Sequence, residues 1–328
     1  MDDLTVIAEA NGGYLMRHQL NDLGYSDAMI RQAMRAGVLR RVRHGTYVPQ
    51  RGWDLMTESQ QHAVITRSIL DKLGPQVVAT HQSAAALLGF DLYGADLRDV
   101  HVTRLDRRRG RREAGVVFHE GVVDDDRDDV VTVGGRLVSS PKRAVFEACS
   151  LSPLETGMVL ATSAMRTGEV SHADLEEDGH RFDHWPGTRT ARLAIRMADP
   201  RLETVGEVRS LHMMWRHRIP HPELQREIVG PDGRLIARTD FAWIDDCHTG
   251  EFDGLVKYGR LNPYVSDVGQ VLTDEKARED LVRDQQLGMT RWTWAEMSAA
   301  RQAATAARIE QGRERSRRLY RRNRTTIV

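Results

Sequence analysis

Apolar and polar residues recur with a helical period in three short segments at the start of the chain. These segments cover residues 2–11, 15–23 and 26–36, and the phrases NGG and LGYS separate them. The following phrase, VLRRVRHGTYVP, alternates and turns at His44-Gly45, which is typical of a β-hairpin. Three short helices followed by a basic hairpin predict a winged helix-turn-helix.

The third predicted helix has an apolar stripe and an outward polar face. It begins after Ser26, a favourable N-cap residue, and stops at Gly37. The inward stripe comprises Met29, Ile30, Ala33 and Met34. A winged helix places its third helix in the major groove and its wing on phosphates. The predicted DNA contacts are therefore Arg31, Gln32, Arg35, Arg40, Arg41 and Arg43. A winged helix that serves only for protein contact is the alternative.

The pattern of residues 54–187 mixes helical and extended stretches, which predicts a middle segment of α/β type. We expect helices at 57–73, 81–88, from Ser140-Pro141 onwards and at 153–166, and strands at 99–103, 115–119 and 130–138. The arginine-rich loop RLDRRRGRREAG either lines a nucleic-acid path or is a solvated loop. His81 and His119 accompany no serine or cysteine with a nucleophile's partners, so we expect structural roles for both.

The pattern changes again from residue 188. Helices are predicted at 188–196, 202–217 and 273–287, strands at 223–229, 235–244 and 289–294, and a basic helix or tail at 299–324. The phrase PDGR marks a hairpin between the first two strands. The order helix, three antiparallel strands, helix and strand follows from this pattern.

Three carboxylates gather around a second predicted hairpin. If its turn centres on Asp245-Asp246, Asp240 and Glu251 face each other with Cβ atoms about 5 Å apart. Glu251 and Asp253 flank Phe252 and therefore share one face of the strand. Converging carboxylates suit Mg²⁺ or Mn²⁺, whereas unpaired carboxylates on a buried strand face would be costly without a cation. The pattern predicts a metal site built from Asp240, Glu251 and Asp253.

Composition adds limits to this picture. The chain has 328 residues, 29% of them charged, a net charge of zero and two cysteines. No apolar run approaches the ~20 residues that span a bilayer, and the N-terminus does not resemble a signal peptide. We expect a cytoplasmic protein without membrane contact, in a reducing compartment. Arginines gather at residues 40–43, 104–112 and 313–324, so local basic patches remain possible sites for phosphate despite the neutral total.

The N-terminal phrase GVLRRVRHGTYVP resembles the DNA-binding domain of AbiEi-family antitoxins over residues 4–50. This resemblance implies DNA as a partner and a cognate toxin or regulatory partner. The middle segment, through phrases such as DVHVT, resembles the AbiEi-like part of actinobacterial proteins that join such an N-terminus to a nuclease-like C-terminus.

The string EFDG and the carboxylate spacing resemble the PD-(D/E)XK nuclease superfamily, in the branch related to very-short-patch-repair endonucleases, over residues 200–297. The resemblance implies that Asp240, Glu251 and Asp253 hold the metal, and that Glu207 on the preceding helix points into the site. At the superfamily's usual lysine position stands Asp253, so either Lys257 supplies the positive charge or the active site is degenerate.

The predicted fold class is α+β multidomain. We expect a winged helix at 1–53, a middle α/β domain at 54–187, a restriction-endonuclease-like domain at 188–298 and a basic C-terminal helix or tail at 299–328. The predicted function is DNA binding with Mg²⁺-dependent hydrolysis of phosphodiester bonds. The alternative is a non-enzymatic AbiEi-like antitoxin and autorepressor that keeps a nuclease-like fold. A homo-oligomer is compatible with both.

Overall fold

The computed structural model describes residues 3–106, 108–121, 123, 128–254 and 284–324. Contacts divide the chain into two compact units, residues 1–198 and 199–328. Within the described residues, no helix combines the length and the apolar character needed to cross a membrane.

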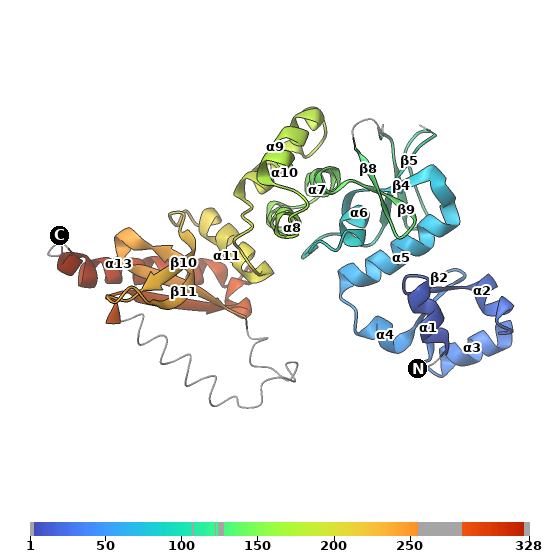
Figure 1. Ribbon diagram of the computed structural model, residues 1–328, viewed down its shortest axis with the longest axis horizontal. Helices are drawn as coiled ribbons and strands as arrows, with labels where there is room; N and C mark the ends of the chain where they lie inside the picture. Colours follow the sequence, from blue (N-terminus) through green and yellow to red (C-terminus); the bar gives the residue numbers. More distant parts are fainter. Residues whose placement is uncertain (1–2, 107, 122, 124–127, 255–283, 325–328) are drawn as a thin grey trace. The chain divides into compact units, whose positions relative to one another are not determined.

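The first unit begins with a three-stranded sheet and three helices in the order of a winged helix (Figure 1). The elements are α1 (Asp3–Ala10), β1 (Leu15–Met16), α2 (Arg17–Asp22), α3 (Asp27–Arg35), β2 (Leu39–Arg43) and β3 (Thr46–Pro49). The strands pair antiparallel in the order β1-β3-β2. The three predicted helices and the hairpin are confirmed, whereas the short strand β1 was not expected.

Local signals set the ends of α3. The Ser26 side chain accepts a hydrogen bond from the Met29 amide, and Gly37 adopts a φ of +70° after the helix. Ile30 is buried, and Ala33 and Met34 pack against the same core. Met29 was predicted to face inward but is 46% exposed, so the apolar stripe is narrower than the sequence indicated.

The rest of the first unit is a six-stranded mixed sheet with helices. The elements are α4 (Gln50–Asp54), α5 (Glu58–Leu73), β4 (Val77–Ala79), α6 (His81–Leu87), β5 (Val100–Arg104), β6 (Arg111–Glu113), β7 (Val116–His119), β8 (Val130–Val133), β9 (Arg136–Ser139), α7 (Pro141–Ser150), α8 (Leu154–Arg166), α9 (His172–Gly179) and α10 (Thr188–Met197). The strand order is β6-β7-β5-β4-β9-β8. β5 pairs parallel with β7 and antiparallel with β4.

Two expectations for this unit need correction. The single strand predicted at 130–138 is a hairpin, because Gly134 and Gly135 take φ values of +54° and +79° and turn the chain. The helix predicted at 188–196 was assigned to the C-terminal domain, but α10 lies in the first unit. Ala194 packs so closely on Gly157 of α8 that a Cβ on this glycine would lie 2.8 Å from the Ala194 Cβ.

A buried network of charged side chains begins on α7. Arg143 donates from Nε to Glu147 at 2.7 Å and from Nη1 to Asp129 at 2.6 Å. Arg181 joins Asp129 to Asp178. Arg143, Glu147 and Asp129 are at most 1% exposed, so each charge depends on its partner for stability.

The winged helix is joined to the sheet of the same unit by a second polar cluster. Tyr14 donates its hydroxyl proton to Asp71 of α5, and Arg136 of β9 contacts Asp71 at 2.6 and 2.8 Å. Burial, together with the hydrogen bond to Asp71, raises the pKa of Tyr14 to about 12. This cluster fixes the start of β1 against α5.

The second unit is a four-stranded sheet with helices. Its elements are α11 (Val205–Arg216), β10 (Glu223–Val229), β11 (Leu235–Trp243), the 3-10 turn η4 (Ile244–Asp246), β12 (His248–Asp253), β13 (Gly288–Thr293), η6 (Trp294–Met297) and α13 (Gln302–Arg324). The order is β10-β11-β12-β13, antiparallel except for the parallel pair β12–β13. The predicted strands are confirmed; the helix predicted at 273–287 lies, up to residue 283, outside the described residues.

Helices α11 and α13 cover the same face of this sheet. Trp292 of β13 donates to Ser210 of α11 at 2.8 Å, and His248 of β12 contacts Ser316 of α13 at 2.9 Å. Trp292 and His248 lie on one face, because the β12–β13 register pairs Phe252 with Trp292 and residues two apart share a face. The basic segment 299–324 is thus a helix packed on the sheet rather than a loose tail.

Candidate functional site

The exposed face of α3 is the first part of the candidate nucleic-acid interface. Arg31, Gln32 and Arg35 are all exposed, as the sequence predicted. With its side chains an α-helix is about 10–12 Å across, which fits the roughly 12 Å width of a major groove. Arginine and glutamine are side chains that read guanine and adenine edges there.

The hairpin β2–β3 is the second part, but its three arginines differ. Arg40 and Arg41 are exposed. Arg40 lies 3.8 Å from a carboxylate oxygen of Asp54 and over the ring of Trp53, so its guanidinium is oriented by α4. Arg43 instead donates to the carbonyl oxygen of Ala114, in the turn between β6 and β7. Burial lowers the pKa of Arg43. The structure therefore presents Arg40 and Arg41 outward and uses Arg43 inside the unit.

The arginine-rich loop of the middle segment is largely satisfied by its own neighbours. Arg111 and Arg112 belong to β6, which pairs with β7. The Arg111 guanidinium lies 4.9 Å from the Phe118 ring centroid, and Arg112 pairs with Asp99 at 2.6 Å. This part of the chain is a strand, where the sequence predicted a loop.

Asp240 and Glu251 lie where the sequence placed them, at the point where β11 and β12 part. The register pairs Phe241 with Gly250, so Asp240 and Glu251 occupy the next opposed positions, on the same face. At this point hydrogen bonds between side chains of β11 and the backbone of β12 take the place of backbone–backbone hydrogen bonds. Thr239 donates to the Gly250 carbonyl at 3.2 Å, and Asp240 accepts from the Phe252 amide at 2.9 Å.

Glu251 has a cationic neighbour on the next strand. Arg291 is its register partner on β13, and the two side chains form an ion pair at 3.0 Å. Among the described residues, Asp240, Glu251 and Asp253 do not form a group of three with ligand atoms close enough to share one ion. Asp253 ends β12, and Lys257 lies outside the described residues.

Glu207 is buried in the first turn of α11, where it stabilises the helix start. It accepts from the Glu203 amide at 2.8 Å and from the Thr204 hydroxyl at 2.8 Å, while Thr204 caps the Glu207 amide. Gln225 of β10 donates to the Glu207 carboxylate at 2.9 Å. The backbone φ of Gln225 is +52°, an unfavourable conformation for this residue type. Glu207 thus reaches the sheet through Gln225, which lies between the register positions opposite Phe241 and Thr239.

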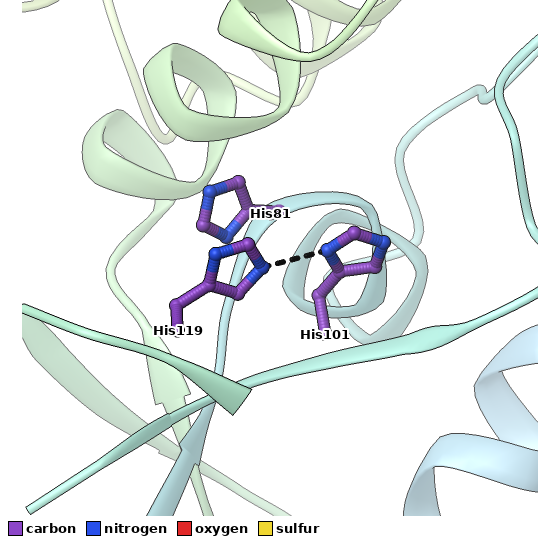
Figure 2. A group of neighbouring side chains, drawn as sticks. All are labelled: His81, His101 and His119. Atoms are coloured by element: carbon purple, nitrogen blue, oxygen red, sulfur yellow. Dashed lines mark hydrogen bonds between the residues drawn. The ribbon is translucent and has the colours of Figure 1, made fainter. Parts of the chain in front are cut away.

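Sequence reasoning did not group three histidines that the structure brings together. His81 begins α6, His101 lies in β5 and His119 ends β7 (Figure 2). One ring nitrogen from each lies within 4.8 Å of the others. The signal available in the sequence was the motif VHVT, in which His101 alternates with buried valines.

Residues 3–50 match the family model described as "Transcriptional regulator, AbiEi antitoxin". The match spans α1 to β3, which is the winged helix of the structure. This segment, called the AbiEi-type domain below, is thus similar in sequence to AbiEi-type transcriptional regulators.

Two relatives come from two strains of Mycobacterium tuberculosis, and both are named only as uncharacterized proteins. Each is 30% identical to this chain over 189 residues, which is 56% of this chain. The match covers 65% of the length of each relative. The AbiEi-type domain therefore carries the functional information in these comparisons.

Proposed function

We propose that the protein is a DNA-binding transcriptional regulator that reads duplex DNA with α3 and touches the flanking phosphates with the β2–β3 wing. The single observation that carries this proposal is the polar face of α3, exposed on a winged helix that matches AbiEi-type regulators. An antitoxin that represses its own promoter fits the same domain, with a cognate toxin as its protein partner.

Binding to the chain's own upstream DNA tests the proposal, with a scrambled duplex for comparison. Arg31→Ala should cost about 1–3 kcal/mol on the specific duplex and relax specificity, because it removes a base contact. Arg41→Ala should weaken binding to both duplexes and lower the salt slope by about 1, because it removes a phosphate contact. Arg51→Ala, which removes an exposed charge from α4, is the control. Equal affinity of all three variants and the parent would overturn the proposal.

A second candidate function is Mg²⁺-dependent cleavage of DNA by the second unit, and the parting of β11 and β12 at Asp240 and Glu251 favours it. In this proposal Asp240 and Glu251 bind Mg²⁺ or Mn²⁺, Asp253 adds a ligand or accepts a proton, Lys257 stabilises the charge on phosphate, and Glu207 supports the site. The metal would lower the pKa of its bound water and neutralise the scissile phosphate.

Nicking of supercoiled plasmid in Mg²⁺ tests the second candidate. Asp240→Asn should abolish nicking, whereas Asp232→Asn in the exposed β10–β11 turn should leave it unchanged. Nicking that persists undiminished in Asp240→Asn rejects the assignment of cleavage to this site. Plasmid left intact by the parent rejects the cleavage proposal but not the DNA-binding proposal.

A further inference from the structure

The histidine cluster of the first unit is built from three separate elements, and neither proposed function uses it. His101 and His119 lie on neighbouring parallel strands, and both project from the same sheet face because the register pairs His101 with Val117, two residues before His119. His81 follows β4, whose next residue, Thr80, donates its amide to the His101 carbonyl at 3.0 Å. The backbone therefore holds the three rings together before any ligand arrives.

The three rings are in direct contact (Figure 2). His101 Nδ1 and His119 Nε2 are 2.8 Å apart, and the centroids of His81 and His119 are 3.9 Å apart. Two nitrogens bound to one tetrahedral zinc ion at 2.0–2.1 Å would be roughly 3.3 Å apart. The spacing of His101 and His119 is thus close to that of a metal-bound pair, and the ligand nitrogens of all three residues lie within 4.8 Å of one another. A bound ion would require His81 to turn its nitrogen edge inward from the face of His119.

His81 is the most unusual member of the cluster. It is 4% exposed, and its Nδ1 has no hydrogen-bond partner among the described atoms. Its φ is +53°, a left-handed conformation that strains a residue with a Cβ. The Glu147 carboxylate fixes this backbone by accepting from the His81 amide at 3.2 Å, and it lies 3.9 Å from Nδ1. A buried nitrogen without a partner, held in a strained conformation, is typical of a binding site.

The charge state of the cluster also suits a metal. Burial, with repulsion from the other histidines, lowers the pKa of His81 well below its usual value. Burial lowers the pKa of His101 and of His119 to about 4. Neutral imidazole is the form that binds Zn²⁺, Ni²⁺, Cu²⁺ and Fe²⁺. His101 and His119 are only partly buried, so solvent can reach the cluster.

We propose that His81, His101 and His119 form a binding site for a divalent transition-metal ion, with zinc as the first candidate. Three imidazole ligands leave a fourth position for water or for an exogenous donor, as in three-ligand zinc sites. The ion would link α6, β5 and β7 and so stabilise the first unit. It would replace the hydrogen bond between His101 and His119.

Metal content of the full chain tests this site. Protein stripped with EDTA, loaded with Zn²⁺ and passed through gel filtration should retain about one ion per chain. His101→Ala and His119→Ala should each lower retention at least tenfold, whereas His172→Ala, which removes a half-exposed histidine from α9, should not. Zn²⁺ should also raise the melting temperature of the parent by about 5 °C and leave that of His119→Ala unchanged.

A spectroscopic measurement on the unaltered chain covers the case in which a variant fails to fold. The ¹⁵N resonances of the His81, His101 and His119 rings should shift when Zn²⁺ is added, and Co²⁺ should give the visible absorption of a four-coordinate nitrogen site. Retention equal in the parent and His119→Ala, or unshifted ring resonances, would overturn the proposal. In that event the cluster is a neutral hydrogen-bonded core. DNA binding by α3 is measured separately and does not depend on this result.

Discussion

The histidine cluster of the first unit and the carboxylates of the second unit are both candidate metal ligands, yet their surroundings differ. The carboxylates of Asp240 and Glu251 accept from the Phe252 amide and pair with Arg291, respectively. In the histidine cluster, the Nδ1 of His81 has no partner among the described atoms, and the other two rings bond chiefly to each other.

This difference shows how the two sets should respond to a cation. A cation at the carboxylates must compete with Arg291 for Glu251, and this competition weakens cation binding. A cation at the histidines displaces a hydrogen bond between two neutral rings and requires the His81 ring to turn from the face of His119, but it competes with no charged partner. The presence of residue types that bind metals is thus a weaker indicator of a metal site than whether other groups already pair with those side chains.

The largest expected effect concerns Glu147, whose carboxylate accepts hydrogen bonds from the His81 amide and from Arg143. Glu147→Ala should lower the free energy of unfolding of the first unit by about 3–5 kcal/mol, because it leaves Arg143 buried without one of its carboxylate partners. Urea denaturation followed by circular dichroism measures the loss. Glu177→Ala on the exposed side of α9 should change the value by less than about 0.5 kcal/mol. A loss below about 1 kcal/mol for Glu147→Ala would mean that the network does not hold the cluster in place.

The next largest effect concerns His248, whose two ring nitrogens both have partners, in contrast to those of His81 in the cluster. His248 contacts Ser316 at 2.9 Å and Thr290 at 3.0 Å, and burial lowers its pKa from 6.5 to about 4. The unfolded state therefore binds the proton first as the pH falls. The second unit should lose stability, on the order of 3 kcal/mol, between pH 6.5 and 4. His248→Gln should flatten this part of the pH profile, and an equally steep profile in this variant would assign the effect to other groups.

Local signals in the sequence predicted much of the fold. Ser26 and Thr57 cap α3 and α5 through side-chain hydrogen bonds, and Gly37 and Gly74 follow the two helices with positive φ. The hairpin centred on Asp245-Asp246 fixed the register of β11 and β12. These features depend on residues close in the chain, so the sequence contains them directly.

Features that depend on distant partners were not predictable. β4 has only three residues, and its neighbours β5 and β9 come from later in the chain. His101 appears as an ordinary alternating strand residue until parallel pairing with β7 brings His119 beside it. Likewise, the carboxylate pattern did not reveal that Glu251 would pair with Arg291, which is 40 residues further along and adjacent only in the folded sheet.

A third prediction sharpens the comparison by removing the competing cation of the second unit. Arg291→Gln should strengthen Mn²⁺ binding about tenfold, because Glu251 no longer pairs with a guanidinium. Titration followed by electron paramagnetic resonance measures the affinity. Arg308→Gln removes an equal charge from a neighbouring arginine, which pairs with Glu296, and serves as the control. Equal gains in both variants would indicate a general charge effect, and the gain should vanish in the Arg291→Gln, Asp240→Asn double variant.

The smallest expected effect concerns one partner of His248. Ser316→Ala should lower the stability of the second unit by about 1 kcal/mol, because it removes the hydrogen bond between Ser316 and Nδ1 of His248 without removing the ring. The pH profile should keep its slope, since burial is the main cause of the lowered pKa of His248. Ser298→Ala, which removes an exposed hydroxyl contact, should have less effect. A flattened profile in Ser316→Ala would show that the hydroxyl partner, and not burial, keeps His248 neutral, and the same explanation would then have to be considered for the mutual hydrogen bond of His101 and His119.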